Sequence, residues 1–282
     1  MTRKNYTSLT EFILLGLADT LELQIILFLL FLVIYTLTVL GNIGMILLIR
    51  IDSQLHTPMY FFLANLSFVD VCNSTTITPK MLADLLSEKK TISFAGCFLQ
   101  MYFFIALATT ECILFGLMAY DRYVTICRPL LYSLIMSRTV YLKMAAGAFA
   151  AGLLNSMVNT SYVSSLSFCG SNVIHHFFCD ISPVLKLASQ HSGFSQLVIF
   201  MLGVFALVIP LLLILVSYIR IISAILKIPS SVGRYKTFST CASHLIVVTV
   251  HYSCASFIYL RPKTNYTSSQ DTLISVSYTI LT

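Results

Sequence analysis

Two charges of opposite sign stand side by side in Met118-Ala119-Tyr120-Asp121-Arg122-Tyr123. They follow a long apolar stretch: residues 91–110 carry no charge, and after Glu111 residues 112–120 carry none either. An acid–base pair at the end of a hydrophobic helix can mark the point where the helix leaves a membrane. It can also form an ion pair that acts as a switch at the membrane surface. The pair alone does not distinguish these two interpretations, so the evidence must come from the surrounding sequence.

Two further acids, Asp70 and Glu111, lie deep inside apolar stretches. An ionisable group in a bilayer is unfavourable and usually faces the interior of a helix bundle. If the two helices pack together, the carboxylates can share a cation such as Na⁺ or a single proton. A structural pair with one neutral, hydrogen-bonded acid explains them equally well. Neither interpretation requires catalysis.

Cysteines stand where a disulfide can form: Cys97 opens an apolar stretch, and Cys169 and Cys179 lie in the mixed segment 163–193. An oxidising exterior permits a bridge, and we expect Cys97–Cys179, which leaves Cys169 without an outer partner; buried free thiols are the alternative. The neighbouring His175 and His176 have metal-ligand character, but adjacent histidines diverge on an extended chain, so we expect no metal site there. The chain has no P-loop, GxSxG or HExxH pattern, and we expect no enzyme.

The composition places these groups in a membrane protein. Of the 282 residues, 57% are hydrophobic and only 10% are charged, against roughly 25% charged in soluble domains. The net charge is +6, but the basic residues stand singly at the ends of apolar runs. That arrangement fits phosphate headgroups of membrane lipid better than nucleic acid. We therefore expect an all-α membrane protein with no nucleic-acid partner.

Hydropathy divides residues 1–282 into one membrane domain with a polar N-terminal segment, 1–22. A spanning helix needs about 20 mostly apolar residues. The expected spans are 23–49, 58–79, 94–120, 141–162, 194–222 (interrupted by Pro210), 237–260 and an incomplete 272–282. The last run would rise about 16 Å as a helix, against a hydrocarbon core of about 30 Å. We therefore expect six full spans and about half of a seventh.

Glycosylation sequons and basic loops agree on one orientation. Asn5 and Asn265 begin sequons in polar segments on the same side of the expected spans. The most basic loops, 122–138 and 220–236, fall on the other side. We expect a multi-pass plasma-membrane protein whose N-terminus is extracellular, with glycans at Asn5 and Asn265.

The outer halves of the third, fifth and sixth spans predict an apolar pocket. They mix large apolar side chains with a few hydroxyls, which suits small, poorly soluble ligands. Each residue taken singly can equally be a helix-packing residue, and His251 can be a packed group or a ligand contact. The candidate lining residues are Phe104, Ile105, Ala108, Thr109, Leu202, Ala206, His251, Tyr252, Ser256 and Tyr259.

Several motifs, in order along nearly the whole chain, carry a family resemblance. They are Gly41-Asn42, Leu55-His56-Thr57-Pro58-Met59-Tyr60, Pro79-Lys80-Met81-Leu82, Met118-Ala119-Tyr120-Asp121-Arg122-Tyr123, Ser217-Tyr218 and Lys236-Thr237-Phe238-Ser239-Thr240-Cys241-Ala242-Ser243-His244. The chain resembles the rhodopsin-like G-protein-coupled receptors, and within them the tetrapod-type olfactory receptors. One motif alone would be weak evidence, whereas the ordered set is very specific.

The resemblance implies a seven-transmembrane helix bundle that binds small volatile odorants. It implies coupling to the heterotrimeric stimulatory olfactory G protein, which raises cyclic AMP. It also implies that Arg122 is the activation switch, paired with Asp121 at rest and moving toward Tyr218 as span six moves outward. His244 and Tyr252 stand at switch positions of the family. Asp70 and Glu111 match the family's ion-site acids.

The chain departs from the family pattern in three places. It has His251-Tyr252-Ser253 where the family usually has Phe-Tyr-Gly, and no cysteine near Ser189. The stretch Pro-Met-Leu-Asn-Pro-Leu-Ile-Tyr, which completes the seventh helix, is not in the sequence. On that basis we expect the 282-residue chain not to signal by itself. A transporter or channel, a polytopic membrane enzyme, or a peptide or hormone receptor are the alternatives, each with less support from the residues.

Overall fold

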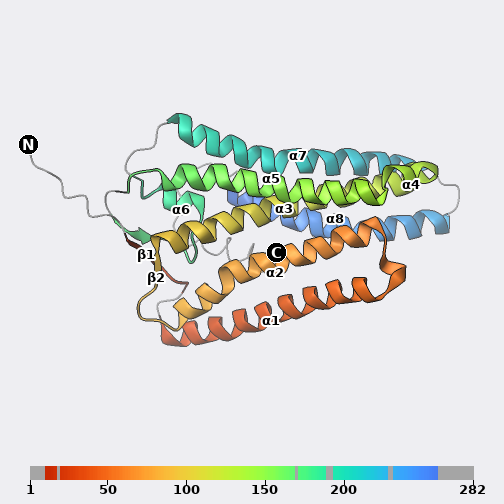
Figure 1. The fold of residues 1–282 in the computed structure, drawn as a ribbon. Helices are drawn as coiled ribbons and strands as arrows, with labels where there is room; N and C mark the ends of the chain where they lie inside the picture. Colours follow the sequence, from red (N-terminus) through yellow and green to blue (C-terminus); the bar gives the residue numbers. More distant parts are fainter. Residues whose placement is uncertain (1–9, 18–19, 169–170, 189–192, 228–230, 260–282) are drawn as a thin grey trace, which may run out of the picture.

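Long helices of the expected kind run side by side in the computed structural model (Figure 1). The structure describes residues 10–17, 20–168, 171–188, 193–227 and 231–259. The long helices are α1 (Leu21–Ile51), α2 (Pro58–Leu85), α3 (Phe94–Cys127), α5 (Arg138–Ser164), α7 (Gly193–Ile225) and α8 (Ser231–Tyr259). The expected last span, 272–282, and the sequons at Asn5 and Asn265 lie outside the described residues, as does Cys169.

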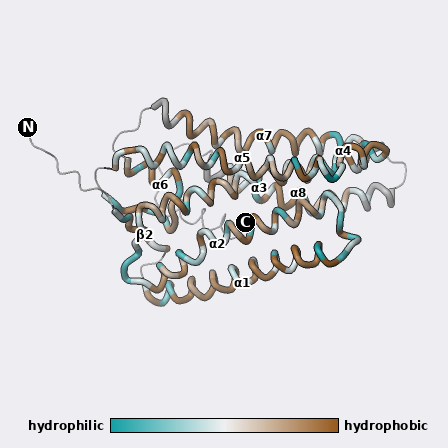
Figure 2. The backbone as a smooth tube through the Cα atoms, viewed as in Figure 1, coloured by the Kyte–Doolittle hydropathy of each residue, from teal (hydrophilic) through white to brown (hydrophobic). Residues whose placement is uncertain are grey.

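Short elements cap the two ends of the bundle. One end has the strands β1 (Glu11–Leu14), β2 (Thr91–Ser93) and β3 (Val173–Ile174) and the helix α6 (Ile181–Leu185). The other has η2 (Pro129–Leu131) and α4 (Tyr132–Ile135), while η1 (Ser53–Leu55) joins α1 to α2. Figure 2 shows apolar residues along the lengths of the helices and hydrophilic residues mainly near their ends, as a bilayer requires.

Helix α3 lies at the centre of the bundle. It packs against α2, α5, α7 and α8. Within the described residues, three helices are long and apolar enough to cross a membrane by length and composition: Leu21–Ile51, Phe94–Cys127 and Leu197–Ile225. Of their most apolar windows, 67% is buried in α3 but only 6% in α1 and 11% in α7. Thus α3 carries the groups that the bundle shields, while α1 and α7 present apolar surface to lipid.

Two prolines do not end helices where the sequence indicated. We expected the second span to end at Pro79 and the fifth to be interrupted at Pro210, but α2 continues to Leu85 and α7 continues through Pro210. An ion pair between Lys80 and Asp84 supports the last turns of α2. In a membrane bundle, neighbouring helices and side-chain hydroxyls compensate for a helical proline.

Small residues allow close helix contact. A Cβ added at Gly152 of α5 would lie 2.3 Å from Thr110 Oγ1 and 2.4 Å from the Ala106 carbonyl oxygen of α3. No side chain larger than hydrogen fits there without separating the helices. Small residues at helix contacts are typical of membrane bundles, where close packing replaces the hydrophobic drive between helices.

The N-terminal segment forms part of a small sheet, which hydropathy did not predict. Strand β1 lies between β2, to which it is antiparallel, and β3, to which it is parallel. Phe12 of β1 is fully buried, and its ring contacts Phe94, Phe98 and Phe168. The described part of the N-terminal segment is therefore packed onto the end of the bundle, over the loops that precede α3 and follow α5.

Candidate functional site

The disulfide between Cys97 and Cys179 is present and fully buried, which confirms the predicted bridge. It fixes the loop after α5 to the start of α3. Gln100 strengthens the attachment, because its Oε1 accepts a hydrogen bond from Cys179 N at 3.0 Å and its Nε2 donates to the Thr76 carbonyl oxygen at 3.0 Å. One side chain thus ties the loop to both α3 and α2.

A cavity of about 200 Å³ lies beneath this loop. Its walls come from α3, α5, α6, α7 and α8. The lining residues are Phe104, Ile105, Ala108, Thr109, Cys112, Asn155, Asn159, Asp180, Ile181, Ser182, Leu185, Ile199, Phe200, Gly203, Val204, Ala206, Leu207 and Ala255. Pockets for drug-sized ligands hold about 300–1,000 Å³, so this one suits smaller molecules.

Five of the predicted pocket residues line the cavity together: Phe104, Ile105, Ala108 and Thr109 on α3, and Ala206 on α7. Leu202, Ser256, His251 and Tyr252 are not part of its wall, and the side chain of Tyr259 lies outside the described part. The spacing of residues along an apolar helix does not fix which face turns inward. The sequence therefore could not tell which of these neighbouring positions face the cavity.

Polar wall residues on α5 and in the outer loop were missed by the sequence reasoning. Asn155 Nδ2 donates to Thr109 Oγ1 at 2.9 Å, and Asn159 Nδ2 donates to the Asn155 carbonyl oxygen at 2.8 Å. Asp180, which follows the bonded Cys179, and Ser182 of α6 also line the cavity. Two asparagines four residues apart on an apolar helix were an available signal, because they fall on one helix face.

Two titratable groups in the outer loop are buried. Asp180 is 6% exposed, and burial raises the pKa of its carboxyl from 3.8 to about 6, although Oδ1 accepts a hydrogen bond from Ile181 N at 2.8 Å. His176 is 4% exposed, and burial lowers its pKa from 6.5 to about 4. At neutral pH the histidine is therefore uncharged, and the aspartate carries a poorly compensated charge.

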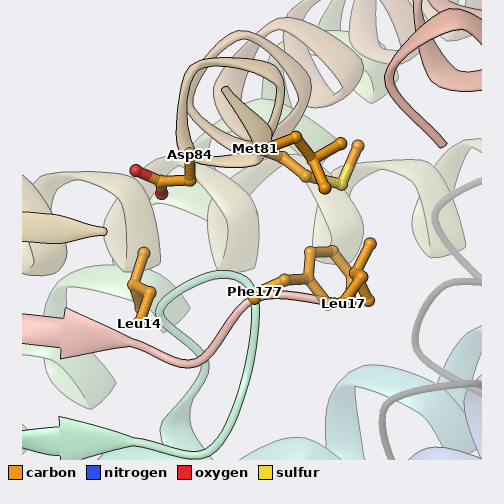
Figure 3. A pocket seen from close by; sticks show the side chains of 7 residues that line it. Leu14, Leu17, Met81, Asp84 and Phe177 are labelled. Atoms are coloured by element: carbon orange, nitrogen blue, oxygen red, sulfur yellow. The ribbon is translucent and has the colours of Figure 1, made fainter. Parts of the chain in front are cut away.

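A smaller hollow lies between β1, α2 and the outer loop (Figure 3). Leu14, Leu17, Met81, Asp84 and Phe177 surround it, and its volume is about 10 Å³. That is about the space of one water molecule. It cannot hold an odorant-sized molecule.

The acids inside the bundle have a partner that the sequence did not indicate. His251 Nδ1 of α8 lies 3.1 Å from Glu111 Oε1 of α3, and its Nε2 lies 3.5 Å from Cys112 Sγ. Asp70 of α2 is close enough to interact electrostatically with Glu111 and His251. Tyr252 OH donates to the Cys112 carbonyl oxygen at 3.2 Å, so α8 is attached to α3 twice.

The donor set is compatible with one small cation. Glu111 Oε2 is buried and has no hydrogen-bond partner within the described structure, and an uncompensated carboxylate oxygen can accept a cation or a proton. The described residues contain no group of three or more His, Cys, Asp or Glu side chains arranged for a metal ion. A transition-metal centre therefore has no support in that part of the chain.

At the opposite end, the expected switch residues are placed differently from the implied resting state. The described residues contain no ion pair within 4.0 Å between Asp121 and Arg122; Asp121 Oδ1 accepts a hydrogen bond from Tyr132 OH of α4 at 2.9 Å. The Arg122 charge acts on Asp121 as well as on Tyr218 and His244, and Arg122 Nε is buried with no hydrogen-bond partner within the described structure. Tyr132 thus supplies the hydrogen bond to the buried carboxylate in place of the guanidinium.

Tyr218 and His244 join α7 to α8. The Tyr218 hydroxyl lies 2.7 Å from His244 Nδ1, and the two rings are stacked with centroids 5.8 Å apart. Both side chains are buried. Separation of α8 from α7 at this end would break this bond, so the geometry provides a contact that distinguishes closed from open helix arrangements.

Comparison with known proteins covers nearly the whole chain. The family model for the olfactory receptors matches residues 31–281. Human olfactory receptor 5F1 is 73% identical over 281 residues, which are 100% of this chain and 90% of the relative. Human olfactory receptor 10K1 is 66% identical, with 100% and 90% covered, and mouse olfactory receptor 5AP2 is 50% identical, with 99% and 88% covered.

Proposed function

Because the chain belongs to the olfactory receptor family, we propose that it binds small, mostly apolar odorants in the cavity beneath the outer loop and signals through the stimulatory olfactory G protein. Family membership makes it an odorant-sensing G-protein-coupled receptor and a multi-pass membrane protein, not an enzyme. The ligand site, the choice of G protein and the switch residues are the parts that we propose.

One observation carries the ligand site: the cavity of about 200 Å³ is walled mainly by apolar side chains and bordered by a loop that is disulfide-bonded to α3. Apolar walls with a few polar groups bind small molecules and fix their orientation. Phe104 and Ile105 of α3 also pack in the apolar cluster that contains Phe178 of the loop and Ala255 of α8. A ligand in the cavity can therefore act on α3, the loop and α8 together.

We propose that the response travels along α3 and α8. The His251–Glu111 contact and the Tyr252–Cys112 hydrogen bond join these helices below the cavity, and Tyr218–His244 joins α8 to α7 at the far end. A ligand that favours outward movement of α8 would shift the population toward the open state. Arg122 would then meet the G protein. Na⁺ held by Asp70 and Glu111 would supply positive charge between α2 and α3.

The experiment measures odorant-induced cyclic AMP in cells that co-express the olfactory G-protein α subunit. The chain is tested as 282 residues and also fused to the C-terminal segment of human olfactory receptor 5F1, of which it spans 90%. The expectation that the 282-residue form does not signal by itself is examined in the same assay. Surface display of every form is measured with an N-terminal epitope tag.

Two matched substitutions locate the ligand. Ala206→Phe places a ring in the cavity wall, whereas Ala146→Phe places the same ring on the exposed face of α5. We expect Ala206→Phe to abolish the response at normal surface display and Ala146→Phe to preserve it. Equal responses from the two variants would remove the cavity as the odorant site. Arg122→Ala is expected to abolish signalling while ligand binding persists.

A further inference from the structure

The cavity wall carries charge of one sign. Among the described residues its lining contains one carboxylate, Asp180, and no Lys, Arg or His side chain. Asp180 lies just before α6, at the end of the bundle that carries β1 and β2 (Figure 1). Its Oδ1 accepts one backbone hydrogen bond, from Ile181 N, and the described residues give its carboxylate no second donor.

Both N–H donors of the Asn159 amide are used, because Nδ2 donates to the Asn155 carbonyl oxygen at 2.8 Å and to Asn155 Oδ1 at 3.2 Å. Asn155 Nδ2 donates to Thr109 Oγ1. A carbonyl oxygen can only accept, so the Asn159 amide must turn its nitrogen toward it. This leaves Asn159 Oδ1 buried without a partner within the described structure. The unused hydrogen-bonding capacity at Asn159 and Asp180 is therefore that of acceptors.

Burial makes the unpaired acceptor oxygens of Asp180 and Asn159 more unfavourable. Asp180 is 6% exposed, and burial raises its pKa to about 6, because little around it stabilises the charge. At neutral pH it is nonetheless mainly ionised. A buried carboxylate with one hydrogen bond gains most from a molecule that brings an O–H or N–H donor. It disfavours a second carboxylate, since like charges in low dielectric repel.

We propose that the cavity selects small apolar molecules that carry a hydrogen-bond donor, a hydroxyl or an ammonium group, with Asp180 as the principal acceptor and Asn159 as the second. Ethers, aldehydes and carboxylates with the same carbon skeleton bind less well. This inference rests on the proposed function, because it uses the same cavity, and it adds the chemical class of the odorant. A ligand without a donor leaves the acceptors unpaired, which is how buried polar groups reject close analogues.

The test compares five probes of similar length: hexanol, hexylamine, hexanal, methyl pentyl ether and hexanoic acid. The purified 282-residue chain in lipid nanodiscs is titrated with each at neutral pH, and ligand-induced thermal stabilisation is measured. We expect hexanol or hexylamine to reach half-saturation at a concentration about tenfold below that of the ether, the change expected from one hydrogen bond to a buried acceptor. Hexanoic acid is expected to bind weakest.

Substitutions assign the preference to the two acceptors. Asp180→Asn keeps the shape and the helix-capping oxygen but adds an N–H donor, so the ranking should reverse toward hexanal, which can only accept. If the amine alone loses its advantage, the preferred donor is an ammonium group; if hexanol loses it too, the shared chemistry is hydrogen bonding. Asn159→Leu should weaken hexanol relative to the ether. Ile199→Val, an apolar change in the same wall, should shift all five probes alike.

Each outcome decides between the two proposals. Equal or tighter binding of hexanal or the ether in the unmodified chain, or an unchanged ranking in Asp180→Asn, overturns the donor preference and leaves the cavity as the odorant site. If none of the five probes stabilises the chain, and Ala206→Phe does not alter the response of the fused receptor to a broad odorant mixture, the cavity itself is not the site and both proposals fail.

Discussion

His251 Nδ1 and Glu111 Oε1 lie 3.1 Å apart in the interior of the bundle, joining α8 to α3. Their side chains are 4% and 3% exposed, so water does not screen the contact. The resemblance to the olfactory receptors implies phenylalanine at this position, so His251 adds a polar attachment between the two helices on which the proposed ligand response depends.

The first prediction concerns this pair. His251→Phe should lower the free energy of unfolding by about 3–5 kcal/mol, because it leaves a buried carboxylate without its partner. Glu111→Gln in the same background should recover much of the loss, since it removes the charge. Thermal unfolding of the two single variants and the double variant gives the coupling energy. A stability of His251→Phe equal to that of the unmodified chain would show that the contact contributes nothing.

The second prediction concerns the contact of α5 with α3. Gly152→Ala should destabilise the protein by about 1–3 kcal/mol or reduce its surface display, because the added methyl group overlaps Thr110 and the Ala106 carbonyl. Gly147→Ala on the same helix meets nothing within 4 Å and should be neutral. The melting temperatures of the two purified variants provide the comparison, and similar values would contradict the close approach.

The third prediction is a pair of opposite pH dependences. The pKa of His176 is lowered to about 4, so its contribution to stability is present above pH 6.5 and is lost as the pH falls toward 4. The pKa of Asp180 is raised to about 6, so its contribution is present below pH 3.8 and is lost as the pH rises through 6. Each contribution is on the order of 3 kcal/mol, and between pH 4 and 6 they oppose each other.

Replacing one of the two titratable groups at a time should reveal the pH dependence of stability that the other one causes. Relative to the unmodified chain, Asp180→Asn should lose stability as the pH is lowered from about 6.5 to 4, and His176→Leu should gain it, by linkage. Melting temperatures across this interval, taken as differences from the unmodified chain, cancel the background titration of other groups. Parallel profiles for the two variants would be inconsistent with the burial of these side chains.

The fourth prediction concerns the loop after α3. Tyr132 donates to the buried Asp121, and burial and the Asp121 charge both raise the pKa of the phenol, so it stays a donor throughout the working range. Tyr132→Phe should remove about 1.5–3 kcal/mol, the value of a hydrogen bond to a charged group. Faster amide hydrogen exchange in residues 129–135 is the expected signature. Tyr123→Phe is the control, because its hydroxyl makes no hydrogen bond within the described structure. If residues 129–135 exchanged at the same rate in the two variants, the Tyr132–Asp121 hydrogen bond would not hold this loop.

The membrane class could be predicted from the sequence, because about 20 apolar residues in succession leave the chain no better environment than a bilayer. The expected Cys97–Cys179 bridge was also confirmed. Helix ends were less predictable: α2 and α7 pass through Pro79 and Pro210, since neighbouring helices compensate for the missing hydrogen bond. Strand β1 was missed because four residues give little periodicity.

Which side chains meet depends on how the helices pack, and this could not be predicted from the sequence. Asp121 accepts a hydrogen bond from Tyr132 of α4, and the described residues contain no ion pair within 4.0 Å between Asp121 and the adjacent Arg122. Glu111 and His251 are 140 residues apart, and Asn159 and Asp180 reach one cavity from a helix and a loop. Such contacts depend on the rotation and depth of each helix in the bundle. Apolar residues around a lipid-facing helix constrain those quantities weakly, so packing fixes them.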